Sequence, residues 1–189
     1  MSEFDFIFIL ISLILGLGIT NLLAGVSRTF HRRRRDGIDD VHMVFTVATL
    51  VVLILNWWVE FSWRTQVHWS FDRFLVIVLW AISLYLMSAF LYPPDISETE
   101  QHRDIWVENR AGYYSAQISS IGFDILQTSL RGQLLHPVWY LPFMLHYALL
   151  AACGLVVARR GFDRFFGWYR LISVLVWALL VRRFLVANP

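Results

Sequence analysis

Long apolar stretches alternate with short polar segments along almost the whole chain. A stretch of about 20 apolar residues is long enough to cross a bilayer as one helix. Such stretches occupy residues 6–26, 43–59, 74–92, 113–130, 138–157 and 171–186. The pattern therefore predicts an all-α integral membrane protein, a bundle of six transmembrane helices in which residues 1–189 form a single domain.

Composition supports this class. Of the 189 residues, 58% are hydrophobic and 16% are charged, against roughly 45–50% and 25% in a soluble domain. All 16 basic residues are arginine, and the absence of lysine excludes Schiff-base chemistry. Cys153 is the only cysteine, so an internal disulfide and a cysteine-based metal site are excluded.

Arginine clusters predict the orientation. Arg28 and the run 32–35 follow the first span, and a second cluster lies within 159–170. The positive-inside rule makes these segments cytoplasmic and places both termini outside. The polar segment 93–112, with Asp95, Glu98, Glu100, Asp104 and Glu108, then becomes an acidic cytoplasmic loop. With six spans, eleven arginines lie in inside loops and five outside; the inside set is Arg28, Arg32, Arg33, Arg34, Arg35, Arg103, Arg110, Arg159, Arg160, Arg164 and Arg170.

The fourth stretch carries a polar stripe. Gln117, Ser120, Asp124 and Gln127 recur at i, i+3, i+7 and i+10, which places them along one side of a helix. Three placements are compatible with this pattern. The stripe faces the bundle interior, lines a water-filled conduit, or lies at the membrane surface if the segment is an interfacial helix and only five helices span.

Other polar side chains lie within or at the ends of predicted spans. Asn21 lies in the first span, Asn56 and Glu60 at the end of the second, and His146 in the fifth. At about 1.5 Å per residue, His146 and Asp124 lie at similar depths, so an ion pair between them is a hypothesis. Pro142 precedes His146 by four residues and predicts a kink.

The first span also carries a face of small residues. Gly16, Thr20 and Ala24 are spaced by four residues, a pattern that allows close approach of another helix. The partner is either a helix of the same subunit or a second copy, which would make the protein a homo-oligomer.

Catalytic and cofactor motifs give no further candidates. Isolated His and Asp pairs lack the context of an acyltransferase motif. The histidines do not have the spacing of a haem or metal site, and no phosphate loop, serine-hydrolase elbow or nucleic-acid face is present. We therefore expect no catalytic residue, cofactor or metal, and no nucleic-acid partner; the expected partner is the lipid bilayer.

Two segments resemble a known family. "GLGITNLLAGVSRTFHRRRR" in the first span and "NWWVEFSW" at the end of the second resemble small, uncharacterised bacterial polytopic membrane proteins. The resemblance covers mainly the first two spans. It implies a helical bundle in a bacterial inner membrane, with no known activity and no functional residue to assign.

Two functions are compatible with these features. The first is a non-catalytic membrane component, either an oligomeric scaffold or an accessory subunit for other membrane proteins. The alternative is a channel or transporter-like conduit for an ion or small solute, lined by the fourth-span stripe with Glu60 and His146, because ionisable groups inside membranes often mark pathways. An intramembrane enzyme is a third, less favoured class.

Overall fold

A computed structural model describes residues 3–60, 69–93, 102–135 and 137–186, without the side chains of 32–36 and 180–186. The regular secondary structure of this part of the chain is helical, and no strand is present in it, as predicted. Its six helices are α1 (Glu3–Asp36), α2 (Asp40–Glu60), α3 (Phe71–Leu91), α4 (His102–Leu130), α5 (Tyr140–Val156) and α6 (Arg160–Val186).

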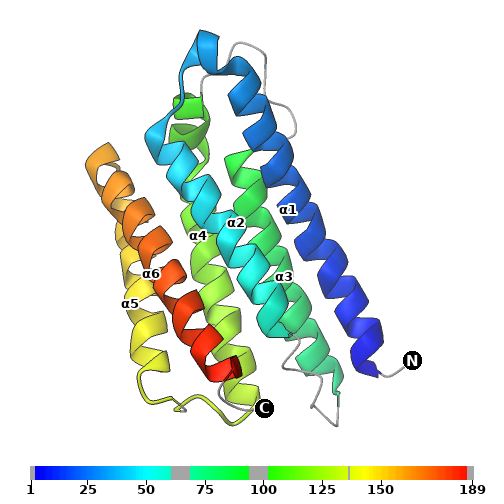
Figure 1. Cartoon of the computed structure of the whole chain (residues 1–189). Helices are drawn as coiled ribbons and strands as arrows, with labels where there is room; N and C mark the ends of the chain where they lie inside the picture. Colours follow the sequence, from blue (N-terminus) through cyan, green and yellow to red (C-terminus); the bar gives the residue numbers. More distant parts are fainter. Residues whose placement is uncertain (1–2, 61–68, 94–101, 136, 187–189) are drawn as a thin grey trace.

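Successive helices run antiparallel, so α1 begins and α6 ends at the same end of the bundle (Figure 1). We call this the terminal end, and the opposite one, where α2, α4 and α6 begin, the arginine end. Helix α3 packs against α1 and α4, α2 packs against α1 and α6, and α4 packs against α5. Helix α4 therefore lies within the bundle and not across one of its ends.

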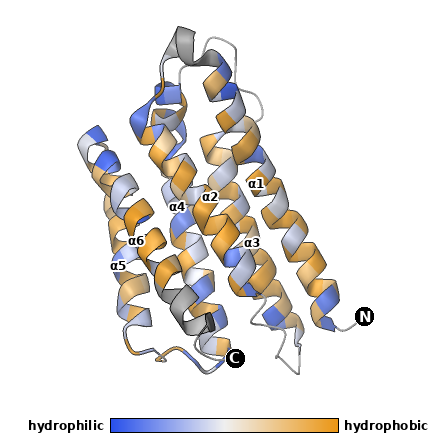
Figure 2. Cartoon of the chain, in the orientation of Figure 1, coloured by the Kyte–Doolittle hydropathy of each residue, from blue (hydrophilic) through white to orange (hydrophobic). Residues whose placement is uncertain are grey.

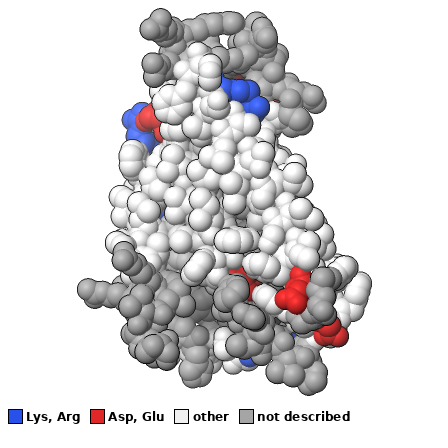
Figure 3. All heavy atoms as spheres, turned by 45° about the vertical axis from the view of Figure 1, so that its right-hand side comes forward, with Lys and Arg blue, Asp and Glu red and all other residues white. Residues whose placement is uncertain are grey.

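Three helical segments of the described chain are long and apolar enough to cross a membrane: Glu3–His31 within α1, Asp40–Glu60 and Phe71–Leu91. Helix α5 is apolar but shorter. Apolar residues dominate the first three helices, whereas α4 carries more polar positions (Figure 2). On the face shown in Figure 3, charged side chains gather toward the two ends and leave an almost uncharged belt between them. These features indicate membrane association.

The helix ends follow local signals. Helix α1 continues through the arginine run, so the prediction of a loop there is wrong, and it ends before Gly37, whose φ is +73°. Glycine favours this left-handed conformation after a helix. Asp39 caps α2 by accepting a hydrogen bond from the backbone N–H of His42 at 2.8 Å. Ser70 caps α3.

Two further boundaries correct the sequence analysis. Helix α4 begins at His102, so residues 102–112 of the predicted acidic loop are helical. This part of α4 packs into the bundle with the buried side chains of Ile105 and Trp106. Their burial explains why a polar sequence forms a helix there. Asp95, Glu98 and Glu100 lie outside the described residues. Helix α5 begins at Tyr140, so Pro142 lies in the first turn, where a missing N–H costs no helical hydrogen bond and the predicted kink is not needed.

Ion pairs join the starts of α2 and α6 at the arginine end. Arg160 contacts Asp39 at 2.5 Å and Asp40 at 2.7 Å, and Arg164 contacts Asp40 at 2.6 Å. The hydrogen bond to Asp39 raises the pKa of Arg160. Because these side chains are partly exposed, the pairs orient the two helices and contribute little to stability.

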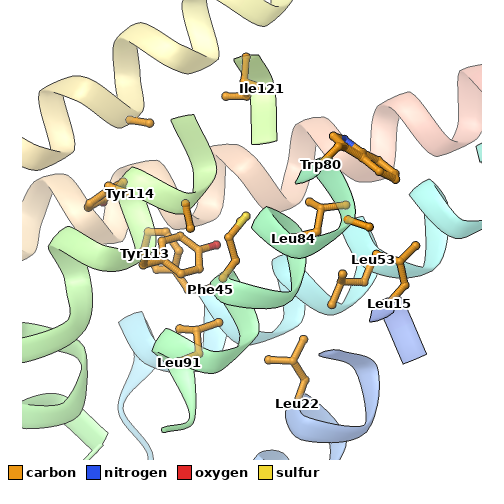
Figure 4. Close-up of a cluster of buried hydrophobic side chains, with 14 of the residues drawn as sticks. Leu15, Leu22, Phe45, Leu53, Trp80, Leu84, Leu91, Tyr113, Tyr114 and Ile121 are labelled. Carbon is orange, nitrogen blue, oxygen red and sulfur yellow. The ribbon is translucent and has the colours of Figure 1, made fainter. Parts of the chain in front are cut away.

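The core is rich in aromatic rings. Phe45 of α2 stacks on Trp106 of α4 with ring centroids 4.2 Å apart, and it meets the edge of Tyr113 at 5.1 Å. Figure 4 shows Phe45 and Tyr113 beside Leu84 and Leu91 of α3. Aromatic pairs in these geometries are more favourable than their buried area alone implies.

Glycines make room for this aromatic core. A Cβ atom at Gly25 would overlap the ring of Tyr92, and one at Gly154 would lie 2.5 Å from Cζ of Tyr114. A Cβ atom at Gly16, in contrast, would have no neighbour within 4 Å. Thr20 and Ala24, on the same face of α1 as Gly16, are exposed. The predicted small-residue face therefore points outward, and close packing within the subunit uses the opposite side of α1, which carries Gly18 and Gly25.

We predict that Gly25→Ala lowers the thermal midpoint, because the new methyl group would have to displace the buried Tyr92 ring. Overpacking of this kind costs about 1–3 kcal/mol. Gly16→Ala on the same helix is the matched control and should leave the midpoint unchanged or slightly raised. Thermal unfolding in one detergent measures both; equal midpoints for the two variants would contradict the packing described.

Candidate functional site

Two buried arginines connect α4 and α6. Arg110 of α4 pairs with Asp163 of α6, with its Nη2 2.9 Å from Oδ1. Arg170 of α6 donates through Nη1 to Oε1 of Gln117 on α4 at 2.8 Å. Both contacts join residues 53 positions apart, as expected for two helices that run in the same direction (Figure 1). We call these two contacts the α4–α6 ladder; its steps are two helical turns, about 10 Å, apart.

The first step of the ladder is electrically balanced. Arg110 Nε also donates to Oδ2 of Asp163 at 3.3 Å, and Asp163 accepts hydrogen bonds from Tyr114 at 2.8 Å and Trp106 at 3.1 Å. Arg110 further donates to two backbone carbonyls at the end of α5, those of Gly154 and Val157. A buried ion pair whose remaining donors and acceptors are satisfied in this way has a structural role.

The second step has no acidic partner among the described residues. The Arg170 residue is 4% exposed, and Nη1 donates to the Tyr113 hydroxyl as well as to Gln117. Cζ lies 5.6 Å from the centroid of the Tyr113 ring. Within the described part of the chain, Arg170 forms no ion pair, and Nε and Nη2 donate no hydrogen bond. The guanidinium is therefore only partly satisfied by the protein.

Arg170 lines a pocket that lies beside the ladder, toward the terminal end. Its cavity volume is about 140 Å³. The polar lining residues are Asn56, Gln117, Ser120, Asp124, Arg170 and Ser173, and aromatic or aliphatic side chains of α2 to α6 form the rest, among them Val52, Trp80, Phe143, Tyr147 and Trp177.

The structure places the predicted stripe of α4 toward the interior. Gln117, Ser120 and Gln127 are buried, and the first two, with Asp124, line the pocket. The Asp124 carboxylate accepts hydrogen bonds from the Tyr140 hydroxyl at 2.6 Å and from Gln127 at 2.9 Å. The stripe therefore faces the interior of the bundle, where some of its members are packed against other helices and others line the pocket.

The remaining candidates divide between pocket and scaffold. Asn56 lines the pocket. Glu60 is buried at the terminal end of α2. Its carboxyl group interacts electrostatically with Arg131 and Asp124. Asn21 donates to two carbonyls at the end of α3, those of Ser88 and Tyr92, which is a helix-capping role.

The hypothesised ion pair between Asp124 and His146 is wrong. The His146 ring is hydrogen-bonded through Nε2 to the hydroxyl of Tyr169 on α6, at 2.6 Å, whereas the carboxylate of Asp124 is bonded to Tyr140 and Gln127. Similar depth along neighbouring helices is therefore not sufficient, because the two side chains point in different directions around their helix axes.

Sequence reasoning missed the arginines of the ladder. Arg110 and Arg170 were counted in cytoplasmic loops, but both lie in helices and are buried. A signal was present, because Arg110 precedes Gln117 by seven residues and therefore continues the α4 stripe. Asp163 and Arg170 have the same spacing on α6. Two stripes of this kind predict a polar contact between their helices.

The arrangement is suited to binding. Guanidinium, amide and hydroxyl donors face an aromatic and aliphatic wall, as in sites that hold small molecules. Within the described residues, no group of three or more His, Cys, Asp or Glu side chains converges on a metal position.

No protein-family model matches the chain, and neither a curated protein nor a solved structure matches it. The assignment of function therefore depends on the site.

We predict that Asp163→Asn strongly destabilises the protein, because it leaves Arg110 buried without a counter-charge. Breaking a buried pair in this way costs about 3–5 kcal/mol. Arg164→Gln, which removes an exposed pair at the same end of α6, should cost less than about 1 kcal/mol. Chemical or thermal unfolding in one detergent compares the two variants, and similar small losses would refute the structural role of the first step.

Proposed function

We propose that this chain is a six-span integral membrane protein of a bacterial inner membrane, with the arginine end in the cytoplasm and both termini outside. The three apolar helical segments and the charged ends of the bundle support this placement. The even number of antiparallel helices agrees with termini on one side (Figure 1). Helices α4 and α6 would then cross with their charged groups directed toward each other, as intramembrane charges require.

In this topology we propose that the protein binds a small solute in the pocket lined by helices α2 to α6 and serves as a conduit for it. The observation that carries this proposal is Arg170, a buried guanidinium that faces the pocket and has no acidic partner among the described residues. A charge in such a place requires water or a ligand. A purely structural arginine would be compensated as Arg110 is.

Water access to the pocket tests this function. In a Cys153→Ser background, we predict that Ser120→Cys reacts with a water-soluble methanethiosulfonate reagent, because residue 120 lines the pocket. Ser119→Cys is the matched control. It lies one position away on the exposed side of α4, which faces lipid in the proposed topology and should react at least about tenfold more slowly, since the reactive thiolate needs water. Protection of both positions would overturn the proposal.

A second candidate function is that of an oligomeric membrane component or accessory subunit. It is favoured by the outward position of Gly16, Thr20 and Ala24, which leaves a small-residue face of α1 uncovered by the described residues of the subunit. Such faces allow helices of two subunits to approach closely. Solute binding and self-association are compatible, because the pocket lining includes no residue of α1.

We predict that the combined change Gly16→Leu and Thr20→Leu lowers the oligomeric mass of the protein in mild detergent. The two larger side chains would keep the α1 helices of neighbouring subunits apart. Light scattering coupled to size exclusion measures the mass, with Leu149→Ala, on the exposed side of α5, as a control for changes in detergent binding. An oligomer of unchanged mass would place the interface elsewhere.

A further inference from the structure

We infer that the ligand of this pocket is a small organic anion, specifically a monocarboxylate with a compact apolar body, and that Arg170 binds its carboxylate. This inference rests on the proposed solute-binding function and names the class of solute. It is carried by the contrast between the two buried arginines of the α4–α6 ladder, by the chemistry of the pocket wall and by the size of the cavity.

The contrast in partners assigns the charge of the ligand. Arg110 donates to both oxygens of Asp163 and to two carbonyl groups. Among the residues that the structure describes, Arg170 uses only Nη1, toward Gln117 and Tyr113. Nε and Nη2 lie on the same edge of a guanidinium and together match the two oxygens of a carboxylate. A bound carboxylate would thus supply Arg170 with a counter-charge and two hydrogen-bond acceptors, as Asp163 does for Arg110.

The contacts made by Nη1 orient this group. Gln117 accepts at 2.8 Å, and the Tyr113 hydroxyl is itself hydrogen-bonded to Thr49 of α2 at 2.7 Å. The Tyr113 ring lies against the guanidinium, 5.6 Å from its Cζ. Three helices therefore hold the side chain before a ligand binds, which reduces the entropy cost of binding.

The second charged residue of the lining does not call for a cationic ligand. Asp124 lies seven residues, about 10 Å, beyond Gln117 along α4. Its carboxylate already accepts hydrogen bonds from Tyr140 and Gln127. The partly satisfied charge of the pocket is consequently the positive one.

Cavity size and the wall define the rest of the ligand. A cavity of about 140 Å³ is close to the roughly 150 Å³ of an engineered protein cavity that holds benzene. The wall presents the rings of Trp80, Phe143, Tyr147 and Trp177. These features fit an apolar body of about six carbon atoms, so benzoate is a suitable probe.

The test uses the purified full chain in nanodiscs of zwitterionic lipid. Three probes of similar shape and different charge are compared: benzoate, benzyl alcohol and benzylammonium. Calorimetry measures binding, and empty nanodiscs correct for partition into lipid. A change in tryptophan emission is also expected, because two of the nine tryptophans, Trp80 and Trp177, line the pocket. We expect saturable binding of benzoate, binding of benzyl alcohol weaker by about tenfold or more, as for loss of a charged hydrogen bond, and no binding of benzylammonium.

Variants assign the preference to one side chain. Arg170→Met should abolish the difference between benzoate and benzyl alcohol, and Arg170→Lys should retain part of it, because a lysine keeps the charge without the paired donors. Arg164→Gln, at the exposed arginine end, should leave the affinity for benzoate unchanged. If Arg170→Met does not fold, the comparison of the three probes on the unmodified chain decides the question.

Failure of this inference differs from failure of the proposed function. Equal binding of benzoate and benzyl alcohol, or no binding of any probe, overturns the assignment of an organic anion. The solute-binding proposal then still stands if the cysteine at position 120 is labelled and the one at 119 is not. In the expected case, benzoate also slows labelling at position 120 in the Cys153→Ser background, which places the ligand in the pocket.

Discussion

The bundle depends on how it accommodates two guanidinium groups away from bulk water. A buried charge that lacks a partner costs several kcal/mol. Helices α4 and α6 each carry one buried arginine, Arg110 and Arg170. Their arginines lie on facing sides of two helices that run in the same direction, so one register satisfies both contacts. The first step, Arg110 with Asp163, closes this requirement within the protein. The second step leaves the Arg170 guanidinium only partly hydrogen-bonded, at the edge of a pocket. The proposed solute binding is based on this group.

Aromatic rings and glycines fix the geometry around the ladder. Tyr113 and Tyr114 are adjacent on α4, yet they serve different steps, because Tyr114 donates to Asp163 and Tyr113 contacts Arg170. The ring of Tyr114 also occupies the space above Gly154 of α5. A change in the packing of α4 against α5 would therefore move a hydrogen-bond donor of the ladder as well. Packing and charge compensation are coupled through the same side chains, which explains why so many polar groups coexist with an apolar core.

The helices were predictable from sequence, and the site was predictable only in part. Apolar length located all six helices because burial in lipid or in the core requires it. The stripe of α4 grouped Gln117, Ser120 and Asp124 on one side of a helix, and the structure shows that this side lines the pocket. Arg110 and Arg170 were assigned to loops because the positive-inside rule treats arginine as a marker of the cytoplasm, although their seven-residue spacing from Gln117 and Asp163 was visible. The partners of Asp124 and His146 depend on rotation about the helix axes. That rotation is set by packing between helices and has no counterpart in the depth of a residue along its own helix.

The ladder also has a consequence for how the chain is made. The charged partner that Arg110 needs lies 53 residues later in the sequence. An arginine within an isolated span opposes insertion by up to about 2.5–3.5 kcal/mol, so in the proposed topology α4 would insert poorly until α6 has been synthesised. In the six-span topology, the hairpin of α4 and α5 must wait at the insertion machinery or enter lipid late. In that topology, the order in which ribosomes release the helices and the order in which the membrane accepts them would therefore differ.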